Sequence, residues 1–237
     1  MEMKIALTHT GNPEKHSFYI EWLKTSDDIE IVPISADANN LDEIHHCDAL
    51  VLSGGVDIHP KFYGSDKINS AIQYKEKRDE FEMAAFQFAQ ENNLPVLGVC
   101  RGMQLINVIY KGTMKDLGDS LEKIHKGEPD KSHLVNIEKD TILHDIAHEE
   151  KSQINSAHHQ AINKIGEDLV ASATSGEGII EAIERRDKSN KPFLLAVQWH
   201  PERMFRFQLE NTPLSKNIRD RFFEEIKKSI ASKNEGN

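Results

Sequence analysis

Residues 94–104 read LPVLGVCRGMQ, and the stretch changes character at its centre. Residues 94–99 form an apolar run of strand length, whereas residues 102–110 have the apolar spacing of a helix. Cys100 stands at the junction, between glycines at positions 98 and 102. Small neighbours leave room for a strained backbone, so we expect a tight strand-to-helix turn that projects Cys100 above the edge of a sheet.

Apolar strands alternate with helices from this turn back towards the N-terminus. The patterns predict strands at 3–8, 29–34 and 49–53, and helices at 13–25, 40–46 and 77–92. Strands that are apolar throughout are typical of a parallel sheet covered on both faces. This half of the chain is therefore expected to form a doubly wound α/β layer.

The second half of the chain contains mainly short strands. These are predicted at 133–139, 153–156, 169–174, 179–185 and 193–199, followed by an amphipathic helix at 217–232. Few helices separate the strands, which favours a mixed or antiparallel extension of the same sheet. The expected fold class is α/β, a three-layer sandwich with a mostly parallel central sheet and a smaller antiparallel extension, in a single domain over residues 1–237.

Charge and hydropathy restrict the partners of the chain. Its 237 residues include 39 acidic and 29 basic ones, giving a formal charge of −10. Such a field repels phosphate backbones and anionic lipid, so we expect neither nucleic acid nor membrane as a partner. The first apolar stretch is too short for a signal peptide, and no later run could span a bilayer. A cytoplasmic location is the resulting expectation.

The two cysteines receive different interpretations. Two are too few for a disulfide scaffold or a thiolate zinc site. Cys47 lacks glycine neighbours and leads into a strand, so it is expected to pack in the core. Cys100 begins a helix, where the positive end of the macrodipole favours the reactive thiolate. A buried structural thiol is the alternative for Cys100, and a nearby base would decide against it.

Residues 193–202, FLLAVQWHPE, supply such a base. The apolar strand ends at His200, and Pro201 stops it. Open α/β sheets gather their functional residues at the carboxyl ends of the parallel strands, so His200 and Cys100 are expected at the same edge. Glu202 can accept the Nδ1 proton of His200 and fix its tautomer. These residues predict a Cys100–His200–Glu202 triad.

With this triad the chain resembles the class I glutamine amidotransferase superfamily, and more closely the γ-glutamyl hydrolases of its peptidase C26 branch. The shared motifs occur in order at residues 53–57, 77–79, 100–104, 155–160, 178–182 and 197–202. The resemblance implies a flavodoxin-like fold and a cysteine hydrolase that needs no cofactor. It further implies a small γ-glutamyl substrate, such as γ-glutamyl-γ-aminobutyrate, and leaves a homodimer open.

The resemblance also assigns residues around the triad. The backbone N–H groups of Gly55 and Arg101 match the family's oxyanion hole, and the resemblance implies substrate contacts for Gly54, Gln104, Ser156 and His158. For Gln104, a polar residue on a partly buried helix face is an equal interpretation. By the family pattern, residues 78–79 brace the site.

A metal site is not expected at the adjacent histidines 158 and 159. Neighbouring side chains diverge in both helix and strand, and no carboxylates or thiols surround these two in the sequence. The sequence therefore indicates no metal ligand.

Two other functions remain open from the sequence. One is a glutaminase subunit that delivers ammonia to a separate synthase partner, and the other is a non-catalytic binding protein of the same fold. Arg101 after the nucleophile resembles the stand-alone hydrolases, and the intact triad argues against a mere binding protein.

The chain departs from the family at Glu177, where Asp is common, and at Lys111, where Gly is common. Neither position belongs to the triad.

Overall fold

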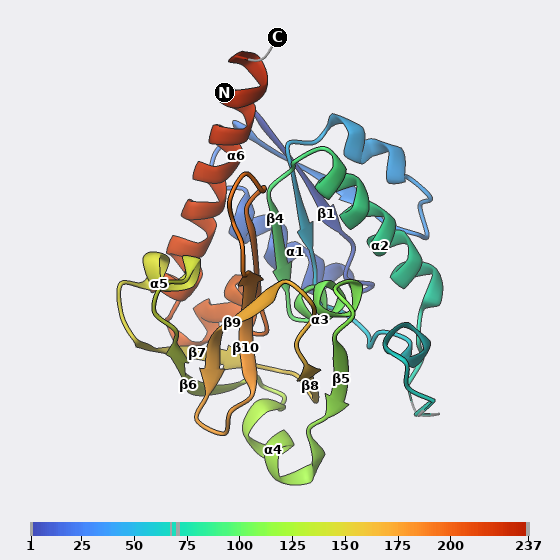
Figure 1. Ribbon diagram of the computed structural model, residues 1–237, viewed down its shortest axis with the longest axis vertical. Helices are drawn as coiled ribbons and strands as arrows, with labels where there is room; N and C mark the ends of the chain where they lie inside the picture. The colour runs from blue at the N-terminus through green and yellow to red at the C-terminus, as the bar shows by residue number, and fades with distance from the viewer. Residues whose placement is uncertain (1, 67, 70–71, 236–237) are drawn as a thin grey trace.

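The computed structural model describes residues 2–66, 68–69 and 72–235 (Figure 1). Its strands are β1 Met3–Thr8, β2 Ile29–Ile34, β3 Ala49–Leu52, β4 Val96–Val99, β5 Thr113–Asp116, β6 Lys131–Ile137, β7 Lys151–Ser156, β8 Gln160–Lys164, β9 Leu169–Ser175, β10 Ile180–Arg185 and β11 Leu194–Val197. Its α-helices are α1 Pro13–Leu23, α2 Glu76–Glu91, α3 Arg101–Ile109, α4 Gly118–His125, α5 Ile142–Ala147 and α6 Ile218–Glu235. Short helices of other types are the 3₁₀ helices η1 Leu41–His46, η2 Pro60–Tyr63 and η3 Pro201–Phe207 and the π-helix η4 Pro213–Asn217.

One nine-stranded sheet runs through the described part of the chain, in the order β2-β1-β3-β4-β11-β10-β9-β6-β7. Neighbours from β2 to β11 pair in parallel. Neighbours from β11 to β7 pair antiparallel. β5 and β8 form a separate antiparallel pair. The predicted α/β class, with an antiparallel extension of the parallel sheet, is confirmed.

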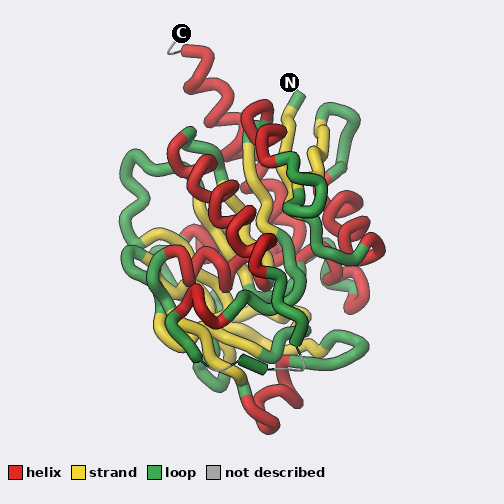
Figure 2. Tube along the Cα trace, turned by 90° about the vertical axis from the view of Figure 1, so that its right-hand side faces the viewer, coloured by secondary structure: helices red, strands yellow, loops and turns green. Residues whose placement is uncertain are grey.

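Helices cover both faces of this sheet, because its strands are apolar on both sides. Along β1, Ile5 and Leu7 pack with α1, α5 and α6, whereas Ala6 packs with α2 and α3 on the opposite face. Figure 1 shows α6 and α2 on opposite sides of the strands, and Figure 2 shows the helices in front of them from a second direction. The α6 residues Ile218 and Phe222 are fully buried, as the amphipathic pattern predicts. The three-layer sandwich is therefore confirmed.

The centre of the sheet brings two distant segments together. β4 and β11 are parallel neighbours, with Val99 opposite Val197. The N–H of Cys100 continues this ladder by donating to the carbonyl of Val197, at 2.7 Å. Parallel strands end at the same edge, so the residues that follow β4 and β11 lie side by side.

Several short elements were not predicted from the sequence. They are β5, β8, α4 and α5, while the helix expected at 40–46 is the 3₁₀ helix η1. β5 reads TMKD and buries only Met114, so its strand conformation depends on pairing with β8 rather than on local pattern. None of the helices in the described ranges combines the length and the apolar run that crossing a bilayer requires.

Candidate active site

Cys100 occupies a strained turn between β4 and α3. Its backbone has φ +53° and ψ −104°, outside the regions that a non-glycine residue ordinarily adopts. The turn is also crowded, because a Cβ atom on Gly102 would lie 2.2 Å from the carbonyl oxygen of Leu52. The strain and the glycine match the tight strand-to-helix turn that the sequence predicts.

His200 and Glu202 form a hydrogen-bonded pair directly after β11. His200 Nδ1 lies 2.8 Å from Glu202 Oε1, and the Glu202 side chain is 1% exposed. Burial and the nearby Arg203 lower the pKa of His200. The Glu202 carboxylate and Cys100 raise it by a larger amount, so that the pKa of His200 is about 9. His200 therefore carries a proton at neutral pH, and Glu202 holds that imidazolium in a fixed orientation.

Cys100 and His200, the predicted nucleophile and base, meet beside Gly54. A Cβ atom on Gly54 would lie 3.0 Å from His200 Cε1 and 3.7 Å from the Cβ of Cys100. Cys100, His200 and Glu202 all line one cavity of about 670 Å³, together with Gly54 and Gly55. A cavity of this size suits a small ligand, for which pockets of roughly 300–1,000 Å³ are usual.

Asn155 positions His200 through its backbone. The amide of Asn155 accepts from the His200 N–H and donates to the His200 carbonyl, both at 3.0 Å. Asn155 itself is fully buried in β7. The sequence indicated no individual role for this residue, although it starts the motif at 155–160; nothing in the sequence alone reveals its contact with His200, 45 residues away.

Gln104 lies behind Cys100 rather than at the cavity wall. Its side chain donates to the carbonyl of Gln160 and to Oε1 of Gln198, each at 3.2 Å. Gln198 in turn donates to Cys100 Sγ at 3.5 Å. Neither glutamine lines the cavity. The substrate contact predicted for Gln104 stays a prediction, and the structure shows that Gln104 orients a neighbour of the thiol.

The loop after β7 presents different residues to the cavity than expected. Ser156 donates to the carbonyl of His125, and His158 Nδ1 lies 2.9 Å from the carbonyl of Gln160. Both are buried and absent from the cavity wall, so their substrate contacts stay predictions. The loop instead lines the cavity with Ala157 and His159.

A buried ionic network braces the glycine turn after β3. Arg101 pairs with Asp79 and Glu82, and its side chain is 1% exposed. Glu82 also binds Arg78 at 2.7 Å, and Arg78 donates to the carbonyl of Gly54 at 2.9 Å. The Arg101 side chain is therefore held by these carboxylates, and it points away from the cavity. The bracing role suggested for residues 78–79 agrees with these contacts.

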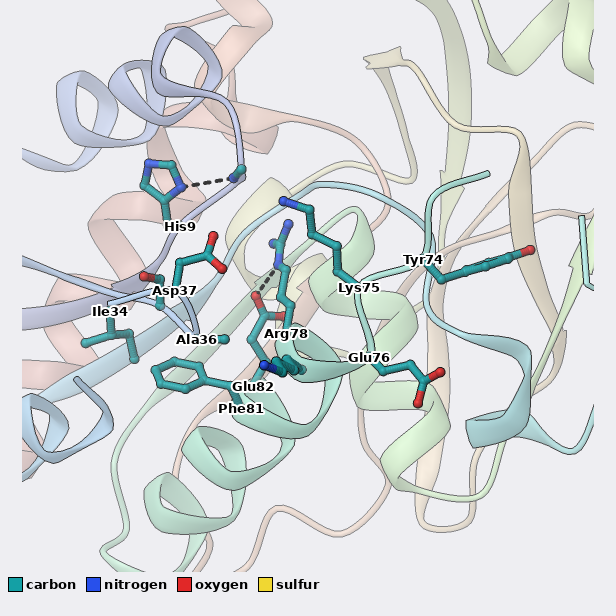
Figure 3. Close-up of a pocket in the computed structure, with 13 residues that line it drawn as sticks. His9, Ile34, Ala36, Asp37, Tyr74, Lys75, Glu76, Arg78, Phe81 and Glu82 are labelled. Carbon is teal, nitrogen blue, oxygen red and sulfur yellow. Dashed lines mark hydrogen bonds and ion pairs between the residues drawn. The ribbon is translucent and has the colours of Figure 1, made fainter. Parts of the chain in front are cut away.

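A second cavity of about 400 Å³ adjoins the first. Figure 3 shows its wall, where the Lys75 and Arg78 side chains lie between His9 and Tyr74 and Arg78 bonds to Glu82. It shares Gly11, Lys75 and Arg78 with the larger cavity but includes none of the triad residues. All three predicted triad residues therefore belong to the larger cavity.

Residues 17–202 match the family model described as peptidase C26. The chain belongs to the peptidase C26 family. The matched region ends at Glu202, so it contains all three predicted triad residues, Cys100, His200 and Glu202. Membership of this family and the relatives below support a hydrolase of the glutamine amidotransferase-like class.

Curated relatives of this peptidase C26 chain carry related descriptions. A glutamine amidotransferase-like protein of Rickettsia prowazekii is 35% identical over 218 residues, covering 73% of this chain and 76% of the relative. The glutamine amidotransferase-like protein YvdE of Lactococcus lactis is 36% identical and covers 73% of each chain. The γ-glutamyl-γ-aminobutyrate hydrolase PuuD of Escherichia coli is 29% identical, and the match covers 65% of this chain and 64% of the relative.

Solved structures share the fold of the peptidase C26 chain. The glutaminase domain of Trypanosoma brucei CTPS superposes with a TM-score of 0.67 at 16% identity, covering 95% of this chain and 94% of the domain. A Thermoplasma acidophilum protein described as a GMP synthase subunit gives 0.66 at 19% identity, covering 99% of this chain and 97% of its own. At these identities the likeness shows the glutamine amidotransferase fold alone.

Proposed function

We propose that this chain is a cysteine hydrolase that cleaves the γ-glutamyl amide bond of a small compound and releases glutamate and an amine. The observation that carries this proposal is the meeting of Cys100, on its strained turn, with the hydrogen-bonded His200–Glu202 pair at one cavity. Family membership supports the same reaction class.

The proposed reaction begins with attack of the Cys100 thiolate on the γ-amide carbon. His200, held as an imidazolium, gives its proton to the departing amine as the tetrahedral intermediate collapses to a γ-glutamyl thioester. Neutral His200 then takes a proton from water as the oxygen attacks the thioester, and glutamate leaves. Glu202 stabilises the imidazolium at both stages. No residue changes its oxidation state, and the proposal requires no cofactor.

Two backbone N–H groups are placed to receive the negative charge on the attacked oxygen. Arg101 opens α3, and the first N–H groups of a helix have no intrahelical acceptor. The N–H of Gly54 donates to Tyr19 Oη at 2.9 Å, whereas the N–H of Gly55 has no acceptor among the described residues. We assign the oxyanion hole to Gly55 and Arg101.

Charges of both signs line the cavity and suit a zwitterionic glutamyl group. Cationic side chains on its wall include Lys15, Lys75 and Arg206, and acidic ones include Glu14 and Glu128. A free α-carboxylate and α-ammonium could each find an opposite charge there. The description of the E. coli relative suggests γ-aminobutyrate as the amine. A cytoplasmic homodimer is part of the same proposal.

A substrate panel tests the proposal against a glutaminase subunit that needs a synthase partner. The purified chain alone would be assayed for glutamate and amine release from glutamine, γ-glutamyl-γ-aminobutyrate and other γ-glutamyl amides and peptides. We expect turnover of at least one amide larger than glutamine. Turnover of glutamine only, or of no γ-glutamyl amide, would contradict the proposal.

Gly55→Ala is expected to lower kcat by about 100-fold, the usual effect of losing one oxyanion donor. The added Cβ would lie 2.0 Å from Nη1 of Arg78, which Glu82 holds in place, so the turn that carries the Gly55 N–H must move. Gly176→Ala is the matched control, because its Cβ meets nothing within 4 Å. The measurement is kcat of both variants from steady-state kinetics. Equal kcat values would contradict the assignment of Gly55 to the oxyanion hole.

A further inference from the structure

A second cluster of titratable side chains lies outside the cavity, where α4, β6, β10 and the loop after β7 meet. It comprises His125, His133, His158 and Glu181. The side chains of His125 and Glu181 are 0% exposed, that of His158 is 2% and that of His133 is 10%. None of the four lines either cavity. The proposed reaction makes no use of them.

Three imidazole nitrogens surround a single carboxylate oxygen, Oε1 of Glu181. His125 Nδ1 lies 3.3 Å from it, and the Nε2 atoms of His133 and His158 each lie 3.6 Å from it. One atom from each of His125, His133 and Glu181 lies within 4.8 Å of the other two. Bonds of about 2.0–2.1 Å in a tetrahedron hold neighbouring ligand atoms about 3.3–3.4 Å apart. The three N···O distances are therefore close to the separation of ligand atoms that share one ion.

Among the described residues the same atoms make no well-aligned hydrogen bond, although the three nitrogens lie within ion-pair distance of Glu181. The atoms concerned are Nδ1 and Nε2 of His125, Nε2 of His133, Nε2 of His158 and both oxygens of Glu181. Buried polar atoms without partners are costly, and a buried carboxylate without one is more costly still. Their concentration at one point indicates a shared partner that lies between them.

Backbone contacts fix which nitrogens face the centre of the cluster. His158 Nδ1 lies 2.9 Å from the carbonyl of Gln160, and His133 Nδ1 lies 3.2 Å from the carbonyl of Leu134. A carbonyl only accepts, so each Nδ1 carries a proton, and in a neutral ring the Nε2 lone pair faces Glu181. Lone pairs facing a carboxylate repel it unless a cation lies between them. Metal-bound histidines commonly donate their second N–H to a carbonyl in this way.

An outer carboxylate completes the arrangement around His125. Its Nε2 atom lies 3.8 Å from Oε2 of Glu177, on the turn before β10. A carboxylate behind a ligating histidine orients the ring and raises its basicity. Glu177 also offsets the charge that three neutral imidazoles and one carboxylate would leave on a divalent ion.

We propose that His125, His133 and Glu181, whose ligand atoms lie within 4.8 Å of one another, bind a divalent transition-metal ion of the zinc class in a structural site. Imidazole nitrogens with one carboxylate oxygen are zinc ligands, and His158, 3.6 Å from Glu181 Oε1, would supply the fourth ligand of a closed site after a small shift of its ring. The ion joins the end of α4 to β6, β10 and the loop after β7. Residues 126–128 and 130, between His125 and β6, line the active-site cavity, so the ion also fixes that wall.

Metal uptake tests the proposal in the full chain. The Cys100→Ala variant, with any affinity tag removed, would be stripped of metal and titrated with Zn²⁺ by calorimetry, because Cys100 and His200 could otherwise bind the ion. We expect about one Zn²⁺ per chain and a rise in Tm on binding. Co²⁺ should give the visible bands of a four-coordinate site without a thiolate charge-transfer band. No uptake would overturn the proposal and identify the cluster as a network of protonated histidines.

Two pairs of variants locate the bound ion. His133→Gln is expected to abolish uptake, whereas the exposed His46→Gln control is expected to retain it. Glu177→Gln, at a side chain that is 37% exposed and so should not disturb folding, is expected to weaken Zn²⁺ binding roughly 10–100-fold, while Glu149→Gln should not. Unchanged uptake in both His133→Gln and Glu177→Gln would place the ion elsewhere and overturn the proposal.

Discussion

Cys100→Ala is expected to lower glutamate release by at least about 10⁴-fold, because the variant has no atom that can form the thioester. The oxyanion hole and the cavity would remain, so a small residual rate above that of water is expected. The measurement is glutamate release from the best substrate of the panel, with circular dichroism to verify the fold. The proposed mechanism would be falsified if the variant retained wild-type turnover.

Cys47 provides the matched control for this experiment. It is 6% exposed, and burial raises the pKa of its thiol to about 12. We expect Cys47→Ala to keep full activity and iodoacetamide to label Cys100 but not Cys47, as read by mass spectrometry of tryptic peptides. Selective labelling of Cys47, or loss of activity in Cys47→Ala alone, would contradict the assignment of the nucleophile.

The elements that the sequence predicted well are those whose evidence is local. The apolar runs of β1 and β2 have the predicted bounds, and the turn at Cys100 is marked by its glycine neighbours. His200 and Glu202 are close together in sequence, so their hydrogen bond follows from two-residue spacing. Local patterns of this kind require no knowledge of long-range packing.

The contacts that the sequence did not predict join residues far apart in the chain. The side-chain amide of Asn155 hydrogen-bonds to the backbone of His200, 45 residues away in the sequence. Gln104 donates to Gln198, which is 94 residues away. A polar residue in a buried strand or helix gives no indication of its partner until the register of the sheet is known. Motif resemblance marked both residues but assigned Gln104 to the substrate rather than to Gln198.

The histidine cluster, which we propose as a metal site, also joins residues far apart in the chain. The expectation of no metal considered His158 with its chain neighbours, which supply no further ligand. The fold instead brings His125, His133 and Glu181 to it from three other elements, including α4, which was not predicted. Spacing rules detect ligands that share a helix or a loop, and they miss ligands collected from separate segments.

Glu202→Gln is expected to lower kcat by about 10³–10⁴-fold with little change in fold. An amide of the same shape can donate to Nδ1, which selects the wrong tautomer of His200, and it cannot stabilise the imidazolium. Glu210→Gln, at an exposed position eight residues further along the chain, is the matched control and should keep wild-type kinetics. Activity of Glu202→Gln within about tenfold of wild type would exclude Glu202 as the orienting carboxylate.

The pH profile separates this role of Glu202 from a purely structural one. In the wild type, Glu202 and Cys100 hold the pKa of His200 at about 9 against burial and Arg203, so kcat/KM should fall as the pH rises through about 9 and the imidazolium loses its proton. Removing the carboxylate leaves burial and Arg203 less opposed, which lowers the pKa of His200. The alkaline limb of Glu202→Gln must then shift to lower pH. A variant that lost stability alone would have fewer active molecules, but its kcat/KM would fall at the same pH as in the wild type. An unshifted alkaline limb would therefore contradict direct electrostatic support of His200 by Glu202.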